Sequence, residues 1–148
     1  MNEVVRLWEG AAEQGHAHAQ YNLGIMYKSG QGVDVNYKKA IEWYEKAAEQ
    51  GYAGAQYNLG TMYGQGHGVD VNYKKASEWY EKAAKQGYAA AQYQMGVMYE
   101  NGVGVNQDDS MTMRWYAKAA AQGFEGAQRQ IGIILARRRK STAGTGGK

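Results

Sequence analysis

Few side chains in this sequence stand where they could do chemistry. The segment Gly64-Gln65-Gly66-His67-Gly68 has the glycine spacing of a phosphate-binding loop. Such a loop works when it follows a strand and opens a helix whose amides point at the anion. No strand is predicted before it, and related turns recur 36 residues away on either side, at Gly30-Gln31-Gly32 and Gly102-Val103-Gly104. The segment is therefore predicted to be a structural turn.

Candidate metal ligands and nucleophiles are equally scattered. His16 and His18 are two residues apart, so they do not share a helix face, and no third ligand is near them in the sequence. Asp108 and Asp109 are expected to cap a helix and face solvent. None of the four serines lies in a nucleophile elbow. We predict no enzyme activity, no metal site and no cofactor.

Composition narrows the class of protein further. The 148 residues are enough for one domain, and without cysteine there is neither a disulfide nor a thiolate site. No apolar run is long enough to span a membrane and no signal layout begins the chain, so a cytoplasmic location is expected. Residues 1–136 carry 12 positive and 14 negative charges, a net charge of −2. The overall net charge of +3 therefore comes from the C-terminal end, and no specific nucleic-acid binding is expected.

An internal repeat determines the architecture. The motif Ala-Ala-x-Gln-Gly occurs at a spacing of 36 residues, at positions 11–15, 47–51, 83–87 and 119–123. Trp43, Trp79 and Trp115 keep the same interval, and 14 of the 21 glycines fall in this register. We expect the tryptophans to lie in the core between repeats. Repeats of this length are typical of solenoids.

Each unit contains two helical patterns joined by a glycine-rich loop. We call the helix before the loop first-type and the helix after it second-type. Asn36, Asn72 and Asp108 precede the second-type helices, where their side chains can cap free amides. One helix pair cannot bury its own apolar face, so neighbouring pairs must stack. The prediction is an all-α fold, a right-handed α-solenoid of stacked antiparallel helix pairs with about eight helices.

The predicted domain covers residues 1–140. It comprises three full units, 17–52, 53–88 and 89–124, and a half-unit at each end, 2–16 and 125–140. The last helix is predicted over residues 126–139, with a disordered tail at 141–148. The basic run within residues 137–140 is interpreted as a charged helix end, and an electrostatic contact with nucleic acid or anionic lipid remains the alternative.

Over roughly residues 5–136 the chain resembles the Sel-one-like repeat family, which is related to the tetratricopeptide repeat. The matching residues are Leu23, Gly24, Tyr27, Gly30, Gly32, Val33, Lys39, Ala40, Trp43, Tyr44, Lys46, Ala47, Ala48, Gly51, Ala53, Ala55 and Gln56. The resemblance implies a protein–protein interaction scaffold or adaptor. Asp34 and Asp70 stand where family members often have proline. The chain also lacks the cysteines of the secreted branch linked to penicillin binding, so that activity cannot be carried over.

The first two full units differ at only seven of 36 positions. If the stack resembles tetratricopeptide arrays, its concave groove is lined by first-type helices, at positions 18, 21, 22, 25, 28 and 29 and their equivalents. Four of the seven differences fall on these six places. This is expected of repeats that share a scaffold and differ in contact chemistry. The predicted groove residues are His18, Tyr21, Asn22, Ile25, Tyr57, Asn58, Thr61, Tyr93, Gln94, Val97, Arg129 and Gln130.

These residues predict a groove for an extended segment or a helix of another protein. Carboxamides both donate and accept hydrogen bonds, so they can hold a main chain. Tyrosine and arginine are frequent hot-spot residues. Replacing Tyr57, Asn58 and Tyr93 together by alanine is expected to abolish binding. Two alternatives stay open: the tyrosines pack between helices, or the chain is a homo-oligomeric structural module that associates through its open ends.

Overall fold

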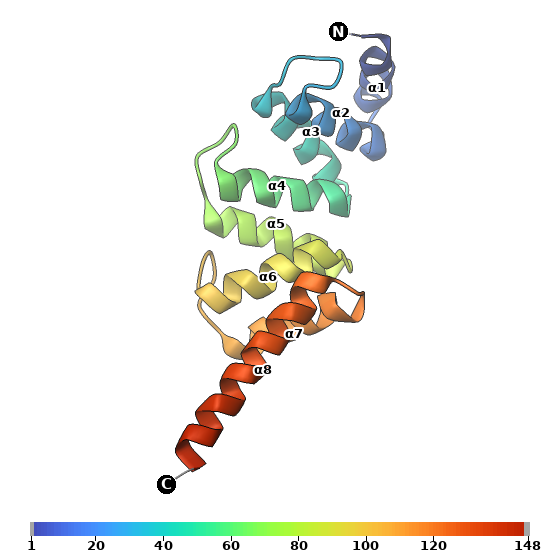
Figure 1. The fold of residues 1–148 in the computed structure, drawn as a ribbon. Coiled ribbons are helices and arrows are strands. Elements are labelled where there is room, and N and C mark those ends of the chain that lie inside the picture. The colour runs from blue at the N-terminus through green and yellow to red at the C-terminus, as the bar shows by residue number, and fades with distance from the viewer. Residues whose placement is uncertain (1, 147–148) are drawn as a thin grey trace.

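The structure is a linear stack of helices. The computed structural model describes residues 2–146, and over that range eight α-helices follow one another with no strand (Figure 1). Each helix packs against the next, which confirms the predicted all-α array of consecutively packed pairs. The helices are α1 (Glu3–Glu13), α2 (Ala17–Ser29), α3 (Tyr37–Glu49), α4 (Ala53–Gln65), α5 (Tyr73–Lys85), α6 (Ala89–Asn101), α7 (Asp109–Ala121) and α8 (Glu125–Gly146).

The predicted helix signals act where expected. The side chains of Asn36, Asn72 and Asp108 accept hydrogen bonds of 3.1, 3.0 and 3.0 Å from backbone amides in the first turn of α3, α5 and α7. The first-type helices α2, α4 and α6 end at glycines in left-handed backbone, with φ of 77°, 70° and 66° at Gly30, Gly66 and Gly102. The three loops that follow lie along one edge of the array (Figure 1). The glycine-rich segments are therefore turns.

Within each repeat, a tyrosine ring lies flat against a helix backbone. The ring of Tyr80 in α5 covers Gly60 in α4, and a methyl group added at Gly60 would stand 2.7 Å from it. The pairs Tyr44 with Gly24 and Tyr116 with Gly96 repeat the contact more tightly still. A side chain at any of these glycines would push the two helices apart. Glycine here permits close approach, since its backbone angles are those of an ordinary helix.

Neighbouring repeats are joined by glutamines. Buried Gln56 in α4 donates to the Ala48 carbonyl of the preceding second-type helix (3.2 Å) and accepts from Gln86 at the end of α5 (2.9 Å). Gln86 also donates to the carbonyl of Gly51 (2.8 Å). The same arrangement holds Gln20 with Gln50 and Gln92 with Gln122. Each buried amide is thus satisfied across a repeat boundary, which sets the register between units.

The tryptophans lie nearer the surface than predicted. Trp115 is buried, but Trp43 and Trp79 are half-buried at the margin of the core. A lysine ammonium lies 4.8 Å from the Trp43 ring and 4.6 Å from that of Trp79. The core position belongs to the following residue, and Tyr44 is fully buried. In α3 and α5 the tyrosine takes the central core position and the tryptophan packs on its flank, whereas in α7 both Trp115 and Tyr116 are buried.

The last helix is longer than the sequence indicated. It continues to Gly146, beyond residues 126–139, and includes most of the segment expected to be a disordered tail. Residues 147–148 of that segment lie outside the described residues. The other first-type helices stop at a glycine, but Arg138 occupies the equivalent position in α8. With good helix formers in place of the stop signal, the helix continues.

The tyrosine–glycine contact predicts opposite effects for the same substitution. Gly60→Ala should lower the free energy of unfolding by about 1–3 kcal/mol, because the methyl group collides with the Tyr80 ring. Gly132→Ala, at the equivalent place in α8, meets nothing within 4 Å. It should raise stability by about 0.5–1 kcal/mol through helix propensity alone. Chemical denaturation followed by circular dichroism measures both, and equal effects at the two sites would contradict the close-packing account.

Candidate interaction groove

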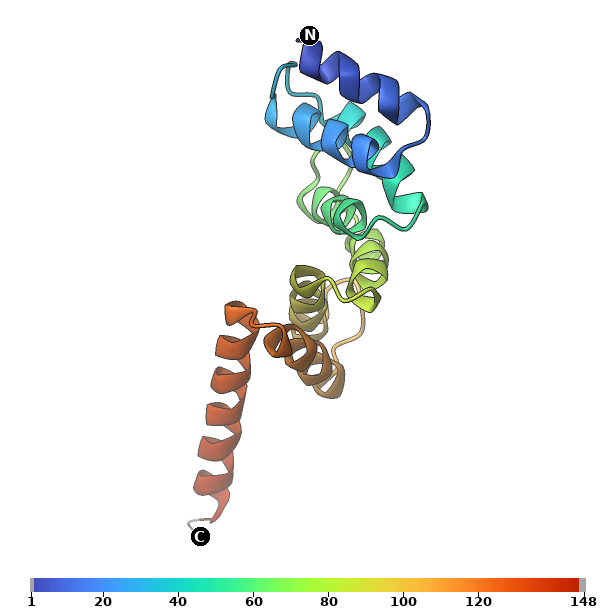
Figure 2. The ribbon, with the colours of Figure 1, turned by 90° about the vertical axis from the view of Figure 1, so that its right-hand side faces the viewer.

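The array curves, and its first-type helices share one side. In Figure 2, α2, α4, α6 and α8 lie on the side toward which the stack bends. We call the surface made by these helices the inner face. Because each first-type helix repeats every 36 residues, equivalent side chains form rows along this face. Differences within a row therefore show where the face departs from the common scaffold.

One hollow of about 330 Å³ opens on the inner face between α4 and α6, with α5 behind it. Four of the predicted groove residues line it: Tyr57, Thr61, Gln94 and Val97. The remaining lining residues are Gly64, Gln65, Tyr73, Ala76, Tyr80, Met98, Asn101 and Val103. The structure thus brings together residues from three helices and a loop. Sequence reasoning identified the contributions of α4 and α6 and missed those of α5 and the loop.

A missing side chain opens this hollow. Gly64 stands where the first unit has Lys28 and the third has Glu100. A methyl group added at Gly64 would meet only Ala76, at an ordinary 3.8 Å, so the space beside it is free. At the boundary between the first and second units, His67 takes the place of Val103 and stacks on Tyr37, with ring centroids 4.9 Å apart. Only the boundary between the second and third units combines a glycine, Gly64, with a valine, Val103, at these places. The Lys28/Gly64 difference was visible in the sequence and was the signal for this site.

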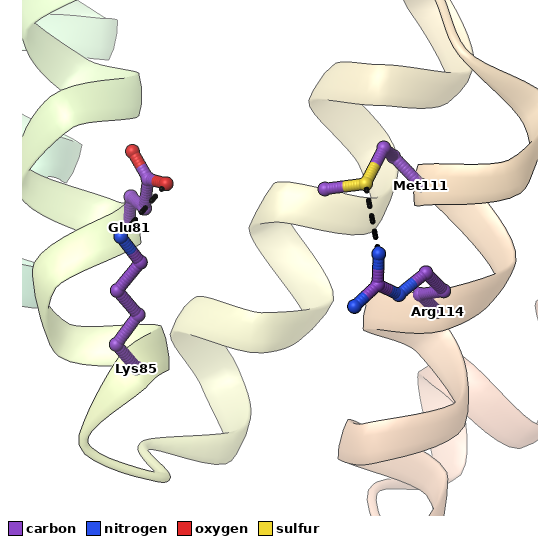
Figure 3. Close-up of polar contacts among 4 residues, drawn as sticks. All are labelled: Glu81, Lys85, Met111 and Arg114. Atoms are coloured by element: carbon purple, nitrogen blue, oxygen red, sulfur yellow. Dashed lines mark hydrogen bonds and ion pairs between the residues drawn. The ribbon is translucent and has the colours of Figure 1, made fainter.

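The lining of this hollow carries no charged side chain. The other two hollows differ. One of about 530 Å³ lies on α3 and α5 among glutamates and lysines, including the ion-paired Glu81 and Lys85, which are 3.3 Å apart (Figure 3). The other, of about 210 Å³, lies between α6, α7 and α8 beside Glu100 and Arg137. Figure 3 also shows Arg114 reaching the sulfur of Met111 on α7. The inner-face hollow is the neutral one among the three.

The tyrosine row serves both packing and surface. The ring of Tyr57 lies between those of Tyr80 and Tyr88, at centroid distances of 5.5 and 5.2 Å. Tyr21 and Tyr93 sit between equivalent pairs of rings. All three are half-buried, so each leaves one edge on the inner face. The packing alternative is therefore correct for part of each ring. The triple alanine variant would remove stacking as well as surface.

The other predicted groove residues lie outside the hollow. In α2, His18 bonds to Tyr52 (2.8 Å) and contacts the Asn22 amide (3.2 Å). Half-buried Ile25 of the same helix packs on the core. Asn58 is half-buried in α4, and Arg129 and Gln130 belong to α8 at the far end. None of these residues lines the neutral hollow. Of the predicted groove residues, the four from the second and third units described with the hollow above are thus the ones that line it.

The hydroxyl of Thr61 has a second role. It lies 2.9 Å from the hydroxyl of buried Tyr80 and gives that group a hydrogen-bond partner. Burial raises the pKa of Tyr80 to about 12, although this hydrogen bond acts in the opposite direction. In the first unit the equivalent residue is Ile25, and the buried Tyr44 hydroxyl has no partner in hydrogen-bonding geometry among the described residues. Burial also raises the pKa of Tyr44, and the neighbouring Tyr21 acts in the same direction while the Asn58 amide acts in the opposite one.

The fold and the rows of the inner face define the class: a repeat protein of the α-solenoid type. The model of the Sel1 repeat matches residues 17–52, 53–88 and 89–124. The chain therefore belongs to the Sel1 repeat family, as the resemblance in its sequence implied. A search of the curated proteins finds no match to the chain.

Solved structures of other repeat proteins are similar. The structure of c5321, a protective antigen present in uropathogenic Escherichia coli strains, aligns with a TM-score of 0.87 and 43% identity over 88% of this chain and 28% of c5321. A Sel1 repeat protein from Oxalobacter formigenes gives 0.79 and 40% identity over 82% of this chain and 48% of the other. Helicobacter pylori cysteine rich protein B aligns with 22% identity and a TM-score of 0.68, over 85% of this chain and 96% of that protein. At this identity the similarity shows a shared fold and nothing further. This chain thus spans less than half of the first two relatives.

The described residues contain neither a cluster of metal ligands nor a membrane-spanning helix. No three His, Cys, Asp or Glu side chains among residues 2–146 are grouped to hold a metal ion. His16 and His18 belong to no such group. Within the same range, no helix has the length and apolar character needed to cross a bilayer.

The two tyrosine environments predict a matched pair of phenotypes. Tyr80→Phe should cost about 1 kcal/mol of unfolding free energy, because it removes the bond to Thr61. Tyr44→Phe removes a buried hydroxyl without a partner and should be neutral or stabilising by up to about 1 kcal/mol. Urea titration of both variants tests this. A larger loss at Tyr44 than at Tyr80 would show that the first hydroxyl is satisfied in solution.

Alkaline pH should unfold the protein through its core tyrosines. Tyr44, Tyr80 and Tyr116 all have raised pKa values in the folded state, chiefly because of burial. The folded state then binds these protons more tightly than the unfolded state, whose tyrosines titrate near pH 10. Stability should be unaffected below about pH 10 and fall as the pH rises toward 12. Unfolding and phenolate absorbance recorded together should rise in one transition, and phenolate formation in a still-folded protein would contradict the burial.

Proposed function

We propose that this chain is a non-catalytic interaction scaffold whose inner face binds an extended segment of another protein. The observation that carries the proposal is the neutral hollow at the second unit, flanked by carboxamide side chains on two helices. Gln94 and Asn101 line it from α6, and Gln65 lines it from α4. Amides on both sides can pair with the donors and acceptors of an extended main chain.

The hollow itself suits one side chain of the bound segment. Its walls are aromatic and aliphatic, with Tyr57, Tyr80 and Val97 among them, and its volume of about 330 Å³ is at the lower end of ligand pockets. Because no charged group lines it, a neutral apolar or aromatic side chain would enter without an unpaired buried charge. We infer that such a residue anchors the segment, while the rows on either side hold its main chain.

Catalysis is not part of the proposal. An enzyme related to the penicillin-linked branch would need a nucleophile beside a base in a pocket. The hydroxyls in the neutral hollow are those of Thr61 and three tyrosines, and no histidine, lysine or carboxylate lines it. A binding role uses every group that is present there.

Gly64→Lys is the sharpest test of binding in this hollow. It gives the second unit the lysine that the first unit has at the equivalent position, Lys28. The helix tolerates lysine at this place, as Lys28 shows, and the added side chain fills the hollow. For peptides selected from a display library on the wild-type protein, affinity should fall at least about tenfold. Fluorescence anisotropy measures it, and circular dichroism checks the fold.

Gly10→Lys is the matched control. It adds the same side chain and charge on α1, where nothing lies within 4 Å of the new Cβ. Affinity should be unchanged in this variant. Equal losses in both variants would indicate a general charge effect, and undiminished binding to Gly64→Lys would place the binding surface elsewhere.

A further inference from the structure

The last helix has an aromatic-ring site that no ring of the described residues occupies, at Gly132; we call this site the α8 seat. Gly132 holds in α8 the position that Gly24, Gly60 and Gly96 hold in the other first-type helices. Each of those three glycines is covered by a tyrosine of the following helix, whereas a methyl group at Gly132 would meet nothing within 4 Å. Beside the seat, Ile133 and Leu135 are 38% and 41% exposed. This face of α8 is built like the faces that receive a second-type helix.

The first helix is the matching piece. By register α1 is a second-type helix, and Leu7 and Trp8 stand where α5 has Trp79 and Tyr80. Its Val5 and Ala12 are buried against the stack, but Leu7 is 71% exposed and Val4 is 54% exposed. Val4 stands where α5 has buried Ala76, which faces Gly64 of α4, so its exposure marks the side of α1 that a first-type helix would cover. The two ends of the array therefore expose complementary halves of one helix pair.

We propose that copies of this chain associate head to tail, with α1 of one copy packing on α8 of another as α5 packs on α4. In that register, Trp8 of the second copy covers Gly132. Arg129, the fourth member of the inner-face row that includes Tyr57, then faces that indole. Within one chain the equivalent pair is Tyr57 and Tyr80, with centroids 5.5 Å apart. An arginine on an indole replaces a tyrosine pair by a cation–π pair.

The exposed leucine also finds an apolar site. In the second unit, Trp79 shares a hollow with Glu45, Glu49 and Tyr63 of the preceding helices. The positions equivalent to these three residues at the far end of the chain are Ala117, Ala121 and Leu135. All three are exposed. Two charged residues are thus replaced by alanines at the one boundary where Leu7 would pack.

The charges of the two helices are opposite. Helix α1 has three glutamates and one arginine, for a net charge of −2. Helix α8 has one glutamate against four arginines and one lysine, for a net charge of +4. Attraction between them selects this pairing over contacts between two α1 or two α8 helices. A head-to-tail contact does not close on itself, so it adds copies in a line as concentration rises.

Sedimentation velocity of the whole chain over a wide range of concentrations is the first test. At low salt the average sedimentation coefficient should increase with concentration, and salt should reverse the increase. Leu7→Glu blocks the α1 face and Gly132→Leu fills the α8 seat. Each variant alone should remain monomeric. Both positions are exposed, and unchanged helical content and melting temperature verify the fold.

Mixing the two blocked variants separates this arrangement from any other self-association. The Leu7→Glu copy keeps its α8 face and the Gly132→Leu copy keeps its α1 face, so the mixture should form a one-to-one dimer and nothing larger. A wild type that stays monomeric, single variants that still associate, or a mixture that stays monomeric would each overturn the proposal. Gly64→Lys should leave self-association unchanged. Failure of the proposed peptide binding can therefore be distinguished from failure of the proposed head-to-tail association.

Discussion

The stack depends on how closely two helices can approach within each repeat. Tyr44, Tyr80 and Tyr116 lie flat on glycines of the preceding helix, and this contact leaves no room for any side chain at the glycine. Because the contact recurs every 36 residues, the same interhelical spacing is repeated along the array. The glutamine links then attach each pair to the next at a constant offset. The inner face is a consequence of these two contacts, because they place the first-type helices in line.

A constant scaffold lets a few positions decide what the inner face can bind. The first two units differ at only seven of 36 positions, yet the hollow occurs in the second. Replacing Lys28 by Gly64 removes a side chain, and replacing Ile25 by Thr61 adds a hydroxyl that Tyr80 uses. Substitutions at such places change contact chemistry at little cost to folding, because the tyrosine, glycine and glutamine contacts lie elsewhere. The proposed head-to-tail contact extends the same geometry between chains.

Most of the fold could be predicted from the sequence, because each repeat contains its own helix start and stop signals. Asn36 and Gly30 mark helix ends through local backbone chemistry, which acts regardless of what packs nearby. Two features could not be predicted this way. The depth at which Trp43 and Tyr44 lie depends on how adjacent helices divide the space between two large rings. The length of α8 depends on the absence of a stop signal at Arg138, where the repeat pattern suggested a helix end.

The sequence predicted which side chains share the inner face, but it could not predict that some of them line a hollow. Helical spacing placed Tyr57, Thr61, Gln94 and Val97 on one face, and in the structure these four residues line one hollow. The depression itself needs Gly64 from one helix, Tyr80 from the next and Val103 from a loop. Their proximity depends on the stacking angle, which no single repeat encodes. Gln56 and Gln86 were likewise visible as a periodic motif, while their bonds to the Ala48 and Gly51 carbonyls of the preceding repeat required the structure.

The most direct test of the account is where a bound segment touches the protein. Backbone amide shifts, assigned by NMR, should be followed while a peptide selected on the wild type is titrated in. We predict that the largest changes fall at Thr61, Gln94 and Val97, with little change on the charged hollow beside Trp79. Changes concentrated at Glu45, Trp79 and Lys82 instead would contradict the claim that the inner face is the binding surface.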